Sequence, residues 1–176
     1  FDHYTDTDQA IANGLSEMYA QGLQMGQALR NLVINPADQK AQSNFEAADK
    51  AFAETLNATE KMAQSTRFAQ PIHELLALRA TQAAKQAEVM SLIKTDPAQA
   101  ATALKQNETP AWRALRSQLL DQIKATRDQA AATHEATKAH AQQITVVSIA
   151  LALIGTIVAG SLFWLLRRTV STELGC

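Results

Sequence analysis

Cysteine, proline, glycine and aromatic residues are all scarce in this chain. Cys176 is the only cysteine, so neither an intramolecular disulfide nor a Cys-x-x-Cys-His haem attachment is possible. The 176 residues include 6 glycines, 4 prolines and 5% aromatic residues, a composition that is typical of long helices with modest cores. The formal net charge of −1 argues against a nucleic-acid partner.

Signatures of catalysis are lacking as well. The chain has no glycine-rich phosphate loop, no His-Glu-x-x-His motif and no nucleophile elbow. The histidines His3, His73, His134 and His140 lie far apart, and the spacing of the last two does not put both on one helical face. The sequence therefore predicts a protein that is not an enzyme and that has no cofactor and no metal site.

One long apolar run dominates the C-terminal part of the chain. Residues 144–166 contain 23 residues without a charge. As a helix they would span roughly 34 Å, enough to cross a hydrocarbon core of about 30 Å. Arg167 and Arg168 follow directly, and by the positive-inside rule they mark the cytoplasmic end. Residues 1–143 are then expected outside the cytoplasm; a buried core helix is the alternative.

Apolar residues elsewhere recur with alternating spacings of three and four, the pattern of near-parallel helix packing. Long helices with short connections predict an all-α fold, an antiparallel up-down-up-down four-helix bundle. No Gly or Pro interrupts the last helix before the apolar run, so the bundle is expected to continue into one transmembrane helix. The predicted helices cover residues 7–34, 38–66, 71–94 and 110 to the apolar run, with a short piece at 98–105.

The same spacing predicts which residues face inward. In the first helix they are Ile11, Leu15, Met18, Gly22, Met25, Leu29 and Leu32. In the third helix they are Ile72, Leu75, Leu76, Ala83, Ala87, Met90 and Ile93. Asp38 is expected to cap the second helix, and Thr109 is expected to cap the fourth, with Pro110 in its first turn.

Three arginines predict a binding site at the membrane-distal end, where the bundle topology brings residues near 30 and near 110 to one height. Arg113 and Arg116 share a helical face, and Thr109 lies at the positive end of its helix, which favours an anion. Guanidinium groups hold carboxylates in bidentate pairs. We therefore expect Arg30, Thr109, Arg113 and Arg116 to bind a small carboxylate or similar anion. Solvated arginines paired with acidic neighbours are the alternative.

Two stretches resemble a known family. Residues 18–36, MYAQGLQMGQALRNLVINP, resemble the first sensor helix of bacterial methyl-accepting chemotaxis proteins of the four-helix-bundle type. Residues 167–175, RRTVSTELG, resemble the lead-in to a HAMP domain, a junction that sensor histidine kinases share. The resemblance implies a homodimer in the bacterial inner membrane. It also implies a periplasmic sensor domain at 1–143, a transmembrane helix at 144–166 and the cytoplasmic start of HAMP at 167–176.

The resemblance also implies a function. In better known members, arginines of helix one and the distal part of helix four hold a ligand at the dimer interface. Arg30 matches the helix-one arginine in kind, whereas Thr109, Arg113 and Arg116 match by height alone. The predicted function is a chemoreceptor that senses a small periplasmic anion and signals through helix four to cytoplasmic partners. That output part lies beyond this chain, and an earlier membrane helix is expected before Phe1. The alternatives are the sensor half of a histidine kinase, or a bundle that senses a partner protein without a small-molecule pocket.

Overall fold

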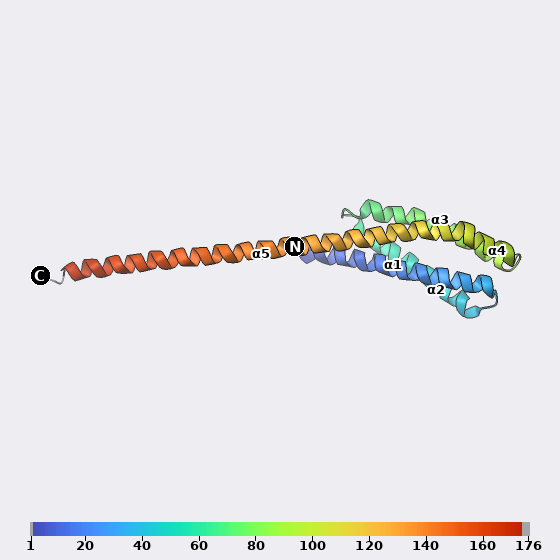
Figure 1. The fold of residues 1–176 in the computed structure, drawn as a ribbon, viewed down its shortest axis with the longest axis horizontal. Coiled ribbons are helices and arrows are strands. Elements are labelled where there is room, and N and C mark those ends of the chain that lie inside the picture. Colours follow the sequence, from blue (N-terminus) through green and yellow to red (C-terminus); the bar gives the residue numbers. More distant parts are fainter. Residues whose placement is uncertain (1, 174–176) are drawn as a thin grey trace. The chain divides into compact units, whose positions relative to one another are not determined.

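The computed structural model describes residues 2–173, apart from the side chains of residues 2–5, 134, 157–159, 163 and 165–173. Within this part the chain is all-helical and has no strand. The side chains of Arg167 and Arg168, on which the predicted membrane orientation depends, lie outside the described residues, as does Cys176. The elements in order are α1 (Asp2–Ile34), α2 (Gln39–Ala63), α3 (Ala69–Ile93), α4 (Pro97–Ala103), a π turn (Leu104–Glu108) and α5 (Thr109–Glu173) (Figure 1).

The chain divides into two compact units, Phe1–Ala130 and Ala131–Cys176. In the first, which we call the helical unit, α1 and α2 pack along their lengths and α3 contacts α1, α2 and α4. The turn between α1 and α2 ends where Asp38 caps α2, because its Oδ1 accepts a hydrogen bond from the backbone N–H of Ala41 (2.9 Å). This confirms the predicted cap.

The interior of the helical unit contains two apolar clusters. All seven residues that the spacing in α1 predicts to face inward are buried. One cluster includes Ile11, Leu15, Phe52, Leu75 and Leu119. The other, near the α1–α2 turn, includes Leu29, Leu32, Val89, Ile93 and Ala103. Apolar residues of all four long helices therefore contribute to the core.

The inward face of α3 differs from the prediction. Ile72, Leu75 and Ile93 are buried as expected, but Ala87 is exposed and Ala83 and Met90 are only half-buried. The interior positions of α3 between Leu75 and Val89 are occupied by polar residues, namely Arg79, Gln82 and Gln86. The prediction followed the apolar residues around the helix, whereas the buried face follows the strict spacing Ile72, Leu75, Arg79, Gln82, Gln86, Val89 and Ile93.

The start of α5 is also different. The sequence predicts a boundary between two helices at residues 107–110, but helical structure continues there as the π turn Leu104–Glu108. The backbone N–H and the Oγ1 hydroxyl of Thr109 both donate to the carbonyl oxygen of Leu104, the hydroxyl at 2.9 Å. Thr109 therefore does not cap a free helix end, and the amide groups that would have attracted an anion there are already occupied.

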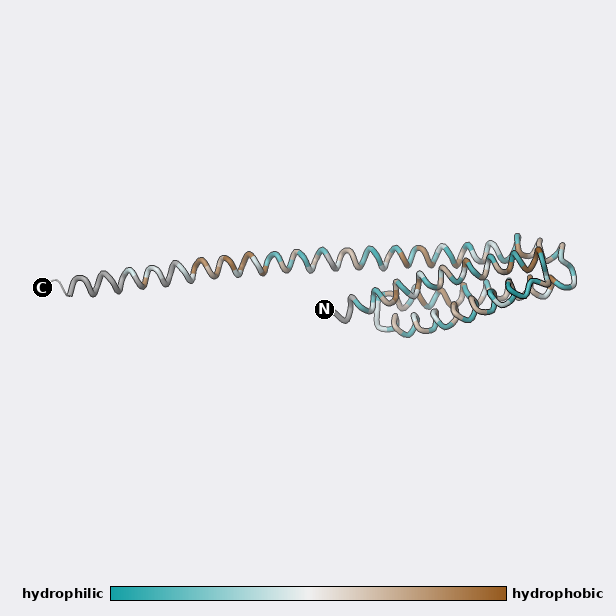
Figure 2. Tube along the Cα trace, turned by 90° about the horizontal axis from the view of Figure 1, so that it is seen from below, coloured by the Kyte–Doolittle hydropathy of each residue, from teal (hydrophilic) through white to brown (hydrophobic). Residues whose placement is uncertain are grey.

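The second unit is the C-terminal part of α5. Its large apolar side chains are exposed, among them Val146, Leu151 and Leu153, and Figure 2 shows the same run in brown. By length and composition, one helix of the described chain is long and apolar enough to span a membrane.

Candidate functional site

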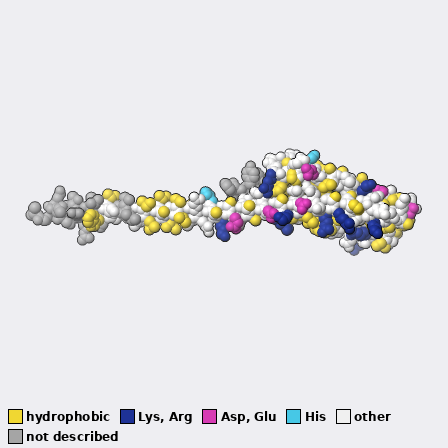
Figure 3. Space-filling model, turned by 45° about the horizontal axis from the view of Figure 1, so that its top comes forward, with side chains coloured by type: hydrophobic (Ala, Val, Ile, Leu, Met, Phe, Trp, Pro, Cys, Tyr) yellow, Lys and Arg dark blue, Asp and Glu magenta, His cyan; other side chains and the backbone are white. Residues whose placement is uncertain are grey.

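The predicted binding residues come from two helices of the helical unit. Arg30 is exposed on α1, Arg113 and Arg116 are exposed on α5, and Thr109 is half-buried where α5 begins. Several Lys and Arg side chains gather on the face of this unit shown in Figure 3. The structure thus leaves all three guanidinium groups accessible to a solute.

An aromatic contact links α1 to α5 beside these arginines. The rings of Tyr19 and Trp112 stack with centroids 6.4 Å apart, and the guanidinium of Arg116 lies over the Tyr19 ring at 5.9 Å. Trp112 is buried, and its six-membered ring fills the space where Gly22 lacks a side chain. Gly22 therefore allows the two helices to approach closely at this point.

A buried polar layer, which the sequence did not reveal, lies between the two apolar clusters. We use this name for Arg79, Gln82, Gln86 and Glu108. Nη1 of Arg79 donates to Oε1 of Gln82 (3.0 Å) and of Gln86 (2.9 Å). The side-chain amides of Gln82 and Gln86 in turn donate to Oε1 of Glu108 (3.2 and 3.4 Å). Two neutral amides therefore connect a buried guanidinium on α3 to a buried carboxyl group at the end of the π turn.

The other side of Arg79 is also occupied. Nη2 pairs with the carboxylate of Asp49 on α2 and contacts Sδ of Met25 on α1 (3.5 Å). The guanidinium also lies over the ring of Phe52, 5.3 Å from its centroid. A buried charge is tolerated only when it is paired and hydrogen-bonded, and Arg79 meets this condition through α2 and α3.

The position of Glu108 in the layer shifts the pKa of its carboxyl. Burial raises the pKa of its carboxyl above the ordinary value. The hydrogen bonds from Gln82 and Gln86 and the positive charges of Arg30 and Arg79 oppose this rise without cancelling it. Arg30 on α1 therefore acts on a carboxyl at the end of the π turn.

A second carboxylate flanks the π turn from α3. Nδ2 of Asn107 donates to Oε1 of Glu88 (2.8 Å), and Nζ of Lys85 donates to Oε2 of the same group (3.2 Å). The Lys85 hydrogen bond, followed by that of Asn107, lowers the pKa of the Glu88 carboxyl. Glu88 therefore stays ionised and holds the outer side of the turn against α3.

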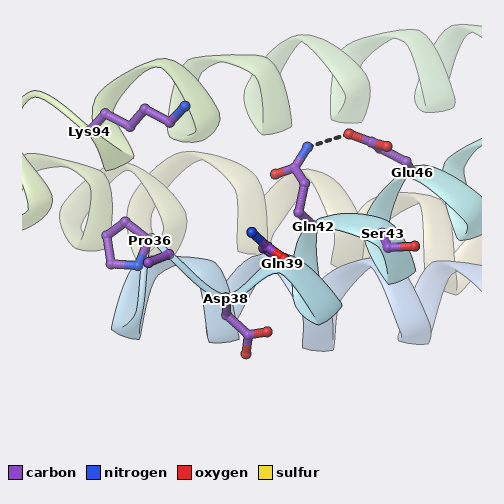
Figure 4. A pocket seen from close by; sticks show the side chains of 8 residues that line it. Pro36, Asp38, Gln39, Gln42, Ser43, Glu46 and Lys94 are labelled. Atoms are coloured by element: carbon purple, nitrogen blue, oxygen red, sulfur yellow. Dashed lines mark hydrogen bonds between the residues drawn. The ribbon is translucent and has the colours of Figure 1, made fainter.

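Two hollows lie apart from the predicted arginines. One, of about 520 Å³, lies where the α1–α2 turn meets the end of α3, and is lined by Pro36, Ala37, Asp38, Gln39, Gln42, Ser43, Glu46 and Lys94. In Figure 4, Lys94 extends from the α3 side and Gln42 is hydrogen-bonded to Glu46 on α2. The other, of about 200 Å³, lies between α1 and α5 and includes Asp8, Asn13 and Arg127. Neither includes Arg30, Thr109, Arg113 or Arg116.

The side chains offer little to a metal ion. In the described part of the chain, no three His, Cys, Asp or Glu residues lie close enough together to hold one.

Comparisons of the chain with models of protein families, with curated proteins and with solved structures found no match. Function must therefore be inferred from the residues themselves.

The titration of Glu108 gives a testable prediction. Because the folded pKa lies above the unfolded one, folded Glu108 keeps a proton that the unfolded chain releases between the two values. Its contribution to stability is therefore present below the ordinary value of 4.5 and is lost as the pH rises through the folded pKa. We expect Glu108→Gln, which stays neutral, to remove this part of the pH dependence and to be at least as stable as the parent at neutral pH.

Thermal unfolding of the full chain in lipid nanodiscs, followed by circular dichroism at several pH values, would measure this. The matched control is Glu74→Gln, because Glu74 is an exposed carboxylate on α3 that accepts a hydrogen bond from Gln70 (3.2 Å). The control should keep the parental pH dependence. Lower stability of Glu108→Gln at neutral pH would contradict the assignment.

Proposed function

We propose that this chain is the sensor half of a transmembrane chemoreceptor that binds a small anion, a carboxylate above all. The observation that carries the proposal is that one helix combines two properties. Within the bounds Thr109–Glu173, α5 contains exposed Arg113 and Arg116 near its start and an exposed apolar run of membrane-spanning length further on. A helix of this composition is suited to link a solute outside a membrane to an output on the other side.

The proposed architecture is an antiparallel up-down-up-down four-helix bundle of α1, α2, α3 and the first part of α5. Residues 1–143 would be periplasmic, residues 144–166 would cross the bacterial inner membrane, and residues 167–176 would begin a HAMP linker to cytoplasmic signalling partners. The buried heptad face of α1 and the short turn before α2 support the bundle. We further propose a homodimer, as in the family that residues 18–36 resemble.

The proposed ligand site joins α1 to α5. Arg30 would hold one end of the anion, and Arg113 and Arg116 would hold the other; Thr109 is left out of the site, because its hydroxyl and its N–H already donate to Leu104. A ligand that prefers one placement of the start of α5 against α1 shifts the populations of the two placements, and this coupling free energy is the signal. The Tyr19–Trp112 contact lies between these same helices, so a shift of α5 would be felt at that contact.

Arg30→Ala tests the proposal directly. We expect near-normal thermal unfolding without ligand, because Arg30 is exposed and Ala is a good helix former. A saturating ligand at a hundred times its dissociation constant stabilises the parent by about 2.7 kcal/mol, and the variant should lose this gain. The measurement is a thermal-shift screen of the full chain in nanodiscs against small organic acids, amino acids and inorganic anions.

The matched control is Arg67→Ala, which removes an exposed arginine outside the proposed site. It should keep the ligand-induced shift that Arg30→Ala loses. Equal loss of intrinsic stability and of ligand shift would make Arg30 a member of a structural ion pair. A ligand shift that survives in Arg30→Ala, or no shift in the parent with any anion, would favour a bundle that senses a partner protein.

A further inference from the structure

The π turn Leu104–Glu108 connects α4 to α5, the helix that carries the apolar run. A π turn contains one residue more than the α-helical turn it replaces, and such turns are rare and frequently lie at functional sites. Here two contacts maintain it: the bonds from Thr109 to the carbonyl oxygen of Leu104, and the insertion of Glu108, its last residue, between Gln82 and Gln86. The inward direction of Glu108 therefore depends on the turn.

The environment of Glu108 suits its neutral form better than its charged form. Glu108 is 2% exposed, and the side chains that donate to its carboxyl are two neutral amides. The charged groups around it are Arg79 on α3, reached through those amides, Arg30 on α1, and Asp49 on α2 beyond Arg79. With Glu108 ionised, the guanidinium of Arg79 would have to balance two carboxylates, because it already pairs with Asp49, and Arg30 is exposed to solvent.

We propose that Glu108 and the π turn form a proton-sensitive latch at the start of α5. With Glu108 protonated, the latch is closed, with the carboxyl inside the polar layer and the π turn intact. When Glu108 loses its proton, the carboxylate leaves the interior and the π turn becomes an α-helical turn. Because an α-helical turn holds one residue fewer, the start of α5 shifts by one residue in register. A one-residue shift corresponds to a rotation of about 100° and a rise of about 1.5 Å.

The fluorescence of Trp112 would report this shift. Trp112 lies four residues after Glu108 and therefore on the same helical face. Its ring is buried against Gly22 and stacks with Tyr19. A rotation of the first turns of α5 would withdraw the ring from Gly22 and bring it to water. The latch does not depend on the ligand proposed above, because it requires only a change in proton concentration.

The test uses the full chain in nanodiscs with Trp164→Phe, so that Trp112 is the only tryptophan. We expect its fluorescence to shift to longer wavelength as the pH rises through the folded pKa of Glu108. Adding Glu108→Gln should hold the emission at its low-pH position throughout the range, and adding Glu74→Gln should leave the pH response intact. A parent whose emission does not change with pH, or a response that survives in Glu108→Gln, would overturn the latch.

A second variant tests the part played by the π turn. Thr109→Val keeps the shape of the side chain but loses the hydroxyl that donates to Leu104 (2.9 Å). A weaker turn opens more easily, so the midpoint of the Trp112 response should move to lower pH. If Thr109→Val leaves the midpoint in place while Glu108→Gln abolishes the response, the proton acts on Trp112 without the π turn, and the latch as proposed is wrong.

Discussion

Replacement of Arg79 by alanine is expected to lower the free energy of unfolding by about 2–4 kcal/mol, because each buried acceptor that loses its donor costs about 1–3 kcal/mol. The Arg79 side chain contacts Asp49, Gln82, Gln86 and Met25 at once. Its loss would leave two buried amide oxygens without a donor and one carboxylate without its cation. Denaturant unfolding of the full chain in detergent, followed by circular dichroism, would measure the change.

Two further variants make this result interpretable. Arg113→Ala removes an exposed arginine from α5 and should change stability by no more than about 0.5 kcal/mol. The double replacement Arg79→Met and Glu108→Gln removes both ionisable groups of the layer while keeping most of its volume, and should recover part of the loss. If Arg79→Ala is as well tolerated as Arg113→Ala, the layer does not hold the helices together.

The variants Gly22→Ala and Gly26→Ala are expected to differ by about 1–3 kcal/mol in their free energies of unfolding. Both positions lie on α1, and both variants replace glycine by the better helix former. A methyl group at Gly22 would overlap the ring of Trp112, whereas at Gly26 it would meet no atom within 4 Å. Gly26→Ala should therefore gain up to about 1 kcal/mol. Gly22→Ala should lose that gain, and more, by displacing the ring.

The same denaturant unfolding would measure both variants. In a Trp112→Leu background the ring is absent, so the difference between Gly22→Ala and Gly26→Ala should shrink. Such a double-mutant comparison isolates the contact itself from the propensity of the helix. Equal stabilities of the two glycine variants in the parental background would show that α5 does not approach α1 closely at Gly22.

The helices were predictable from the sequence because their apolar residues repeat on one face. All seven residues of α1 predicted to face inward are buried, Gly26 and Ala28 are buried in addition, and the predicted cap at Asp38 is present. The interior of α3 was not identified, because Arg79, Gln82 and Gln86 are polar residues at core positions. Strict spacing from Leu75 to Val89 passes through all three, so the helical period indicates their burial although their residue types do not.

The start of α5 was misread for a different reason. Thr109 followed by Pro110 satisfies the local rules for a helix beginning, and those rules do not consider what precedes it. In the fold, the contacts of Glu108 with Gln82 and Gln86 on α3 favour a continuous helical path through this region. Contacts between residues more than twenty positions apart cannot be read from a single sequence, and neither can the proximity of Arg30 to Glu108.

The polar layer also bears on how the helices are aligned along their axes. Apolar heptad faces repeat every seven residues, so a helix that slipped by one repeat would still bury apolar side chains. Such a slip of α3 would carry Arg79 away from Asp49 and replace Gln82 beside Glu108 by Leu75 or Val89, which is costly for buried polar groups. The layer between the two clusters thus selects one alignment among several that hydrophobic burial alone would accept.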